Sequence, residues 1–309
     1  MELQQLRYVV AVAETSSFTR AAERCHVVQS ALSHQIARLE RELGVRLFAR
    51  TSRRVALTPA GEAFLPGARR CLKAADRAVA DVAAAAGEVS GRLAVGVIPT
   101  VAAIDVPAAL QRLRARHPRV EIVLRMGSSD ELIAQVAAGG LDVASVGLPE
   151  GDRPQGVRSR ALARDRLVAV VAASHPLAGA ETVDLRRLAQ ETFVDFPART
   201  AGRAQSDRAF AAAGLARDVA FEVSAADLLA RIVARGLAVA LLPSAYLPEL
   251  PGLVAVAVSD GPSRVEHLVW SDFNPTPATA AFLDVLGLGG DDDRAAAEPA
   301  KPAGPAPTA

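Results

Sequence analysis

Apolar residues in the first 58 positions recur every three or four residues and then alternate over a short stretch. This spacing predicts three helices, at about residues 3–14, 19–25 and 29–43. The third helix has a single apolar stripe, made by Leu32, Ile36, Leu39 and Leu43. Two alternating segments, 48–50 and 55–57, follow and predict a small hairpin, or wing, with basic residues at its tip.

A longer helix is predicted over residues 59–90, with Thr58 as its cap and Pro59 at its first position. Its apolar positions step by three and four residues in turn, which is the heptad pattern of a coiled-coil seam rather than the wider stripe of a core helix. The seam residues are Leu65, Ala68, Leu72, Ala75, Val79, Val82 and Ala86. Because three of them are small alanines, a partner helix could approach closely.

Residues 91–288 repeat the order strand, helix, strand, which predicts a two-lobed α/β domain with a mainly parallel sheet. Strands are expected at about 92–98, 120–124, 143–146, 167–172, 192–195, 219–223, 239–242 and 267–270. Helices are expected from Thr100 to about 117 and at about 129–138, 204–213, 225–234 and 276–286. Trp270 is expected in the core. Residues 289–309 lack periodicity and are predicted to be disordered, so the domain boundaries are 1–58, 59–90, 91–288 and 289–309.

The net charge of +1 conceals two regions of opposite charge. Residues 1–87 carry 13 Lys/Arg and 8 Asp/Glu, a net charge of +5, and the remainder carries −4. A basic excess in a helical module suits a surface that meets phosphates. Charge alone, however, favours an ordinary solvated helix face.

Composition also restricts the compartment and the chemistry. The chain has no run of about 18 apolar residues and no basic-then-apolar N-terminus, so a cytoplasmic protein without membrane contact is expected. Its two cysteines, Cys25 and Cys71, cannot form a disulfide framework. Cys25 is interpreted as a small buried hydrophobe, with a redox thiol as the alternative. The five histidines show no metal-ligand spacing, and no metal or cofactor is expected.

The first module closely resembles the winged helix-turn-helix of LysR-type transcriptional regulators. The match is unbroken over about 60 residues and is carried by Ser17-Phe18-Thr19-Arg20-Ala21-Ala22-Glu23, Gln29, Ala31, Ser33, Gln35-Ile36, Leu39-Glu40, Leu43-Gly44, Leu47-Phe48, Arg50-Thr51 and Leu57-Thr58-Pro59-Ala60-Gly61. Two positions depart from the pattern. Val28 stands where the family usually has Ser or Thr as an N-cap, and Ser30 stands where it often has Pro. A lost cap costs about 1 kcal/mol unless another group satisfies the helix end.

The resemblance implies how this module would bind a double-stranded DNA operator. Gln29, Ser33 and His34 would contact base edges, with Ser30 and Arg38 on the same helix face. Arg50, Thr51, Arg53 and Arg54 of the wing would hold phosphates or enter the minor groove. The alternative is that His34 and the arginines are ordinary exposed residues. The resemblance further implies that the long helix pairs with that of a second subunit in a homodimer or homotetramer, and RNA polymerase is a further candidate partner.

The C-terminal region resembles the effector-binding domain of the same family, which is similar to a periplasmic solute-binding fold. The matching segments are Val95-Gly96-Val97-Ile98-Pro99-Thr100, Gly140-Leu141-Asp142-Val143-Ala144, Phe210-Ala211-Ala212-Ala213-Gly214 and Val239-Ala240-Leu241-Leu242-Pro243. Ligands of α/β sheets bind beyond the carboxyl ends of strands, where helix N-termini can hold anions. A small anionic effector is therefore expected between the lobes, near Thr100, Ser128, Ser129, Arg199, Thr200 and Ser224. Simple capping by Thr100, Ser128 and Ser224, and a plain surface role for Arg199, stay open.

Other functions have less support. The chain lacks a Walker loop, a Gly-x-Ser-x-Gly elbow and a His-Glu-x-x-His motif, so an enzyme is not expected. The rival classes are a solute-binding protein, which would need an export signal and no DNA-binding module, and an enzyme fused to such a module. The Ile98-Pro99-Thr100 segment resembles the peroxide-sensing branch of the family. That branch relies on two effector-domain cysteines, and residues 88–309 contain none, which argues against thiol-based peroxide sensing there.

Overall fold

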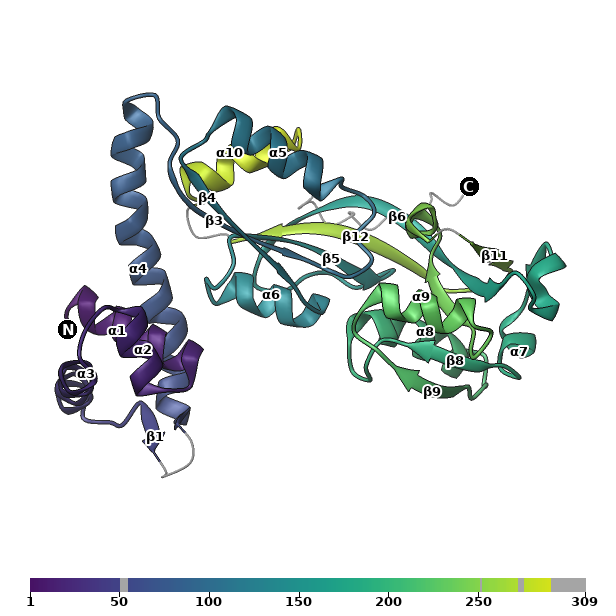
Figure 1. The fold of residues 1–309 in the computed structure, drawn as a ribbon, viewed down its shortest axis with the longest axis horizontal. Coiled ribbons are helices and arrows are strands. Elements are labelled where there is room, and N and C mark those ends of the chain that lie inside the picture. Colours follow the sequence, from purple (N-terminus) through teal and green to yellow (C-terminus); the bar gives the residue numbers. More distant parts are fainter. Residues whose placement is uncertain (51–54, 251, 272–274, 290–309) are drawn as a thin grey trace, which may run out of the picture.

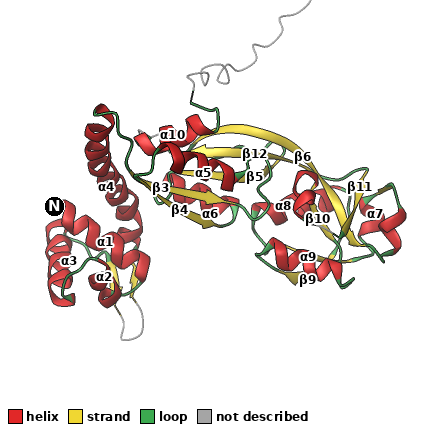
Figure 2. Cartoon of the chain, turned by 45° about the horizontal axis from the view of Figure 1, so that its top comes forward, coloured by secondary structure: helices red, strands yellow, loops and turns green. Residues whose placement is uncertain are grey.

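The computed structural model describes residues 1–50, 55–250, 252–271 and 275–289 (Figure 1). The chain is elongated, with a small helical module and a long helix at one end and a two-lobed α/β domain extending from them (Figures 1 and 2). This confirms the predicted order of a small helical module, a long helix and a two-lobed α/β domain. The tail from residue 290 onward, predicted to be disordered, lies outside the described residues.

The N-terminal module has the predicted elements. They are α1 (Leu3–Thr15), α2 (Phe18–Arg24), α3 (Gln29–Leu43), β1 (Phe48–Arg50) and β2 (Val55–Leu57). The two strands pair antiparallel. The apolar stripe of α3 is buried against α1 and α2 in one core, where Val9, Val12, Leu32, Ile36 and Leu39 are fully buried. Gly44 ends α3 at φ 72°, a conformation that glycine adopts without strain.

The long helix α4 (Pro59–Ala85) begins as the sequence predicts. The Thr58 hydroxyl accepts a hydrogen bond from the Gly61 N–H at 3.0 Å and donates one to the Arg46 carbonyl. A Cβ at Gly61 would lie 2.1 Å from the Leu47 carbonyl oxygen, so only glycine permits this close approach of α4 to the wing. The first turn of α4 is thereby fixed to the DNA-binding module.

The first lobe consists of three parallel strands covered on both faces. The strands are β3 (Gly91–Val97), β4 (Val120–Met126) and β5 (Val143–Pro149), in the order β4-β3-β5. The helices α5 (Val106–Arg116) and α10 (Pro277–Val285) pack on one face in a core that includes Trp270, and α6 (Ser129–Ala137) packs on the other. Trp270 is 6% exposed, which confirms it as a core residue.

Two long strands continue from the first lobe into the second, and they correct the prediction of a mainly parallel sheet. β6 (Arg158–Ala172) and β12 (Ser263–Trp270) are antiparallel to each other, and β12 is also antiparallel to β5, so the sheet is mixed. The sequence predicted only 167–172 and 267–270 as strands. The missed part of β6 is largely exposed and rich in arginine, so its composition is typical of a loop.

The second lobe forms around the distal halves of these strands. It contains β7 (Thr182–Val183), α7 (Leu185–Leu188), β8 (Thr192–Asp195), α8 (Ala201–Ala212), β9 (Asp218–Glu222), α9 (Ala226–Ala234), β10 (Ala240–Pro243) and β11 (Leu253–Val258). Short 3-10 turns lie at Pro176–Gly179 and Ser244–Glu249. The short elements β7, α7 and β11 were not predicted, whereas the β8, α8, β9, α9 and β10 predictions are confirmed within a few residues.

Candidate functional site

The recognition helix α3 presents a polar face opposite its buried stripe. Gln29, Ser30, His34 and Arg38 are exposed, and Ser33 is half-buried. The four exposed side chains make no hydrogen bond or ion pair with the described part of the chain, so they are available to an external partner. The structure therefore gathers all the predicted helix residues on one accessible surface.

Glu40 holds the wing to α3. It is part of the helix-turn-helix motif, but the sequence alone assigned it no role. Glu40 is 5% exposed and its Oε1 accepts hydrogen bonds from the backbone N–H groups of Leu47 (2.8 Å) and Phe48 (3.2 Å). A buried carboxylate with two N–H donors fixes the start of β1 relative to α3. The predicted phosphate contacts Thr51, Arg53 and Arg54 lie outside the described residues, as does the side chain of Arg50.

The predicted seam on α4 divides into a covered and an open part. Ala68 is 2% exposed and is already buried within the single chain, so it is unavailable to a partner. Leu65, Leu72 and Ala75 are half-buried. Toward the end of the helix Val79 and Val82 are 73% and 75% exposed, and Ala86 is exposed as well. The open, apolar part of the seam is therefore the second half of α4.

A cavity of about 510 Å³ lies between the two lobes. Five of the six residues predicted near the effector line it, namely Thr100, Ser128, Ser129, Thr200 and Ser224. Ile98, Met126, Phe196, Leu241 and Pro243 supply apolar walls. A pocket with apolar walls and a few converging polar groups is the usual form of a small-molecule site.

Most of these hydroxyl groups are already hydrogen-bonded within the chain. Ser128 and Thr200 cap α6 and α8 by accepting from Glu131 N–H and Arg203 N–H. The Ser129 hydroxyl both donates to the Gly147 carbonyl and accepts from the Gly147 N–H, at 2.9 and 3.0 Å. Capping is thus confirmed for Ser128, but Ser224 is not a cap, because α9 begins at Ala226 and its N-cap is Ala225.

Thr100 has a different role from the one predicted. The helix expected to start there begins at Val106 instead, capped by the Asp105 carboxylate, because Pro99–Asp105 forms a loop. Thr100 is 5% exposed, and its hydroxyl accepts a hydrogen bond from Nη1 of Arg264 at 2.9 Å. Nη2 of Arg264 donates to the Thr100 carbonyl at 3.0 Å. Thr100 therefore positions Arg264 at the cavity wall and does not cap a helix.

Arg264 of β12 is the cationic residue of the cavity, a position that the sequence prediction gave to Arg199. Arg199 is exposed, has φ 67° and does not line the cavity. Arg264 lines it, is 3% exposed, and has a buried Nε without a partner in the described chain. Burial lowers the pKa of Arg264 below its ordinary value, although the nearby Glu266 carboxylate acts in the opposite direction. Gln205 of α8, 4% exposed, is a further lining residue that was not predicted.

A buried carboxylate completes this cluster behind the cavity. Glu266 is 2% exposed and lies 3.4 Å from Nη2 of Arg264. It also accepts from the Ser145 hydroxyl at 2.9 Å and from the N–H groups of Ala102 and Ala103, each at 3.2 Å. The loop before α5, the central strand β5 and the crossing strand β12 thus meet at one ion pair. Two opposite charges, Arg264 and Glu266, two positions apart in a strand that ends in Leu268-Val269-Trp270, were the available sequence signal for this pair.

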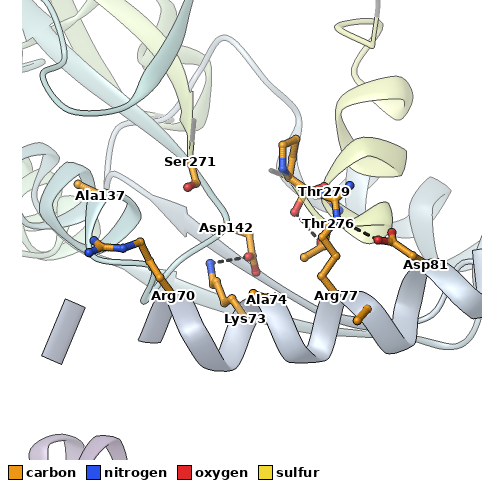
Figure 3. A pocket seen from close by; sticks show the side chains of 13 residues that line it. Arg70, Lys73, Ala74, Arg77, Asp81, Ala137, Asp142, Ser271, Thr276 and Thr279 are labelled. Carbon is orange, nitrogen blue, oxygen red and sulfur yellow. Dashed lines mark hydrogen bonds and ion pairs between the residues drawn. The ribbon is translucent and has the colours of Figure 1, made fainter. Parts of the chain in front are cut away.

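A second, smaller pocket of about 170 Å³ lies where α4 meets the first lobe (Figure 3). Lys73 of α4 forms an ion pair with Asp142 at 2.7 Å, and Asp142 also accepts from the Ala94 N–H at 2.7 Å. Arg77 donates to the Pro275 carbonyl and pairs with Asp81 at 3.2 Å. Figure 3 shows the side chains of Lys73 and Arg77 pointing from α4 toward the lobe. The pocket is thus a contact region that connects α4 to the effector domain.

Two further observations concern metals and membranes. Among the described residues no group of His, Cys, Asp and Glu side chains is arranged to hold a metal ion. Within the same residues, no helix has the length and apolar character needed to cross a bilayer.

Comparison with known proteins matches both the N-terminal module and the two-lobed domain to the same protein family. Residues 3–62 match the description "bacterial regulatory helix-turn-helix protein, lysR family", and residues 86–288 match "LysR substrate binding domain". The chain is 32% identical over 280 residues to the DNA-binding transcriptional dual regulator OxyR of Escherichia coli K12, covering 89% of this chain and 91% of that protein. A full-length OxyR variant from Pseudomonas aeruginosa has a similar structure, with a TM-score of 0.71 and 27% identity over 93% of this chain and 95% of that one. Full-length CbnR in complex with its target DNA gives a TM-score of 0.63 and 26% identity, covering 94% of this chain and 100% of that one.

Proposed function

Because the chain belongs to the LysR family of bacterial transcriptional regulators and is itself a DNA-binding regulator with an effector-binding domain, we propose that its effector is a small anion held by Arg264 between the two lobes. The observation that carries the proposal is the buried guanidinium at the wall of a 510 Å³ cavity. Its Nε has no hydrogen-bond partner among the residues that the structure describes. An unpaired buried donor is costly, so a carboxylate that accepts from it would stabilise the liganded state.

The ligand must also affect the arrangement of the lobes to act as a signal. Thr100 and Ser128 lie on the first lobe, whereas Thr200, Gln205 and Ser224 lie on the second, and all five line the same cavity. A molecule that contacts both sets binds one relative position of the lobes better than another. A regulator responds only through such a difference in affinity between two conformations.

On the DNA side, we assign base contacts to the exposed polar face of α3. Gln29, Ser33 and His34 would contact base edges, and Arg38 and the wing arginines Arg50, Arg53 and Arg54 would contact phosphates. The assembly would form through the open half of the α4 seam, at Val79, Val82 and Ala86. A dimer would place two copies of α3 on one operator, which suits a site with two related halves.

The proposal also includes the compartment of the protein and whether it is an enzyme. We place it in the cytoplasm, where its operator lies, and we assign it no catalytic reaction. Although its relatives include hydrogen peroxide-inducible genes activators, the free thiols of the chain are Cys25 in the DNA-binding module and Cys71 on α4. Burial raises the pKa of the Cys25 thiol, which makes it less reactive. A thiol-based peroxide response in the effector domain would therefore have no nucleophile.

The proposal is tested by selecting binding sites from random double-stranded DNA with the full-length protein. The selected site should bind with an affinity that falls steeply as salt rises, as phosphate contacts require. The measurement is then repeated with a panel of small carboxylates and with uncharged compounds of similar size. A shift in affinity caused only by uncharged compounds would contradict an anionic effector.

A further inference from the structure

Val28 is an exposed hydrocarbon side chain at the start of the recognition helix. It is 69% exposed, whereas its neighbour Val27 packs against the core of the module. Its own carbonyl accepts from the N–H groups of Ala31 and Leu32, so its backbone position is fixed as the N-cap of α3. The side chain therefore has a defined place on the surface, next to Gln29.

This N-cap differs from those of most other helices in the chain. The helices α2, α4, α6, α8 and α10 have Ser or Thr as the N-cap, and its hydroxyl accepts a hydrogen bond from a backbone N–H. The N-cap of the recognition helix is Val28, whose side chain makes no capping hydrogen bond. The exposed isopropyl group neither caps the helix nor packs in the core, so it is available to a partner of the helix. A contact with DNA gives this side chain a partner.

The chemistry of the major groove identifies which group an isopropyl side chain would meet. The edges of adenine, guanine and cytosine present hydrogen-bond donors and acceptors, and thymine alone adds a methyl group. An isopropyl group placed against a donor or acceptor would remove water from it without replacing the hydrogen bond, which is unfavourable. Against a thymine methyl it buries apolar surface on both sides. Residues at the N-terminus of a recognition helix are the ones that reach base edges.

We propose that Val28 is a specificity-determining residue that contacts the 5-methyl group of a thymine in each half of the operator. This inference rests on the assignment of α3 as the recognition helix. The polar neighbours Gln29 and Ser30 are exposed beside it, so an amide and a hydroxyl are available for the adjacent bases. Together they would read a short sequence that contains the thymine.

The test replaces thymine by uracil, one position at a time, in a DNA site selected by the full-length protein. Uracil lacks only the methyl group and keeps the hydrogen-bonding edge. Because one buried methyl group is worth about fourfold in affinity, the natural chain should lose about fourfold at one position in each half-site. Val28→Ala should bind the thymine site more weakly and should no longer distinguish thymine from uracil at that position.

Two further variants separate this contact from a general effect on the helix. Val45→Ala removes the same atoms from another exposed valine, 48% exposed, and should keep the full uracil sensitivity. Val28→Thr keeps one methyl group and adds a hydroxyl that can cap α3, so it should raise the melting temperature and retain part of the thymine preference. The inference is overturned if Val28→Ala has the same uracil sensitivity as the natural chain, or if the natural chain has none. Failure to select any DNA would instead refute the DNA-binding assignment itself.

Discussion

The DNA-binding surface and the effector cavity differ in how their polar groups are satisfied. On α3, Gln29, Ser30, His34 and Arg38 are exposed and make no bond with the described chain. In the cavity, Ser129, Thr100 and Arg264 are buried and already bonded to other protein groups. A site that meets a large, charged duplex can present free side chains to water. A site that holds a small molecule away from water keeps most of its polar groups paired within the protein, and Nε of Arg264, which has no partner among the described residues, is the exception here.

This difference leads to different expectations for mutations at the two sites. Truncating a free surface side chain should change binding and leave the free energy of unfolding nearly unchanged. Truncating a paired, buried side chain should change both, because its former partners lose their hydrogen bonds. The following predictions run from the largest expected effect to the smallest.

Val79→Asp tests whether the exposed second half of α4 binds a second copy of the chain. Val79 is 73% exposed in the single chain, so the variant should fold normally. In a paired seam, however, two unpaired carboxylates would be desolvated, at a cost of at least about 5 kcal/mol. Light scattering at micromolar concentration should show a smaller assembly. Val45→Asp, at an exposed valine outside α4, should leave the assembly unchanged; a Val79→Asp protein of unchanged size would refute the seam.

Arg264→Met should have the largest effect on stability of any change in the cavity. It leaves Glu266 buried without its cationic partner, and breaking such a pair costs about 3–5 kcal/mol. Urea unfolding should show this loss. Arg199→Ala provides the matched control, since Arg199 is exposed and should change stability by less than about 0.5 kcal/mol. Equal stabilities for the two variants would contradict a stabilising ion pair between Arg264 and Glu266.

Gln29→Ala and Arg54→Ala should weaken DNA binding in different ways. Gln29→Ala is expected to cost about 1–3 kcal/mol on the selected site and to relax the preference at one base position. Arg54→Ala should weaken selected and scrambled DNA alike and reduce the log–log salt slope by about 1. Affinities for both DNAs at several salt concentrations distinguish a base contact from a phosphate contact. The assignment of roles is wrong if Gln29→Ala weakens both DNAs equally.

Thr100→Val is expected to have the smallest effect on stability and a selective effect on the signal. It removes the hydroxyl that accepts from Arg264 while nearly keeping the volume, at a cost of about 1 kcal/mol. DNA binding without effector should persist, and the response to the effector should be lost. Ser224→Ala, which removes a hydroxyl on the opposite lobe, serves for comparison. A normal response by Thr100→Val would show that its bond to Arg264 is only structural.

The sequence predicted the DNA-binding module much more closely than the effector site, for a physical reason. In the module, helix spacing, caps and surface residues are local properties, so α3 and its polar face could be located from 29–43 alone. In the cavity, Arg264 meets Thr100 across 164 positions of the chain. No local pattern contains that contact, and Arg199, next to a capping threonine, was the better candidate by spacing. The long strand β6 was missed because its exposed first half lacks the apolar alternation of a strand.

The most direct test of the central claim compares a carboxylate effector with its neutral primary amide in a titration of labelled operator DNA. The two molecules have nearly the same shape, and they differ in the charge that Arg264 would bind. We expect the acid to shift the DNA-binding midpoint of the natural chain and of Arg199→Ala, and the amide to have little effect on either. An amide that shifts the midpoint as strongly as the acid would contradict an anion bound at Arg264.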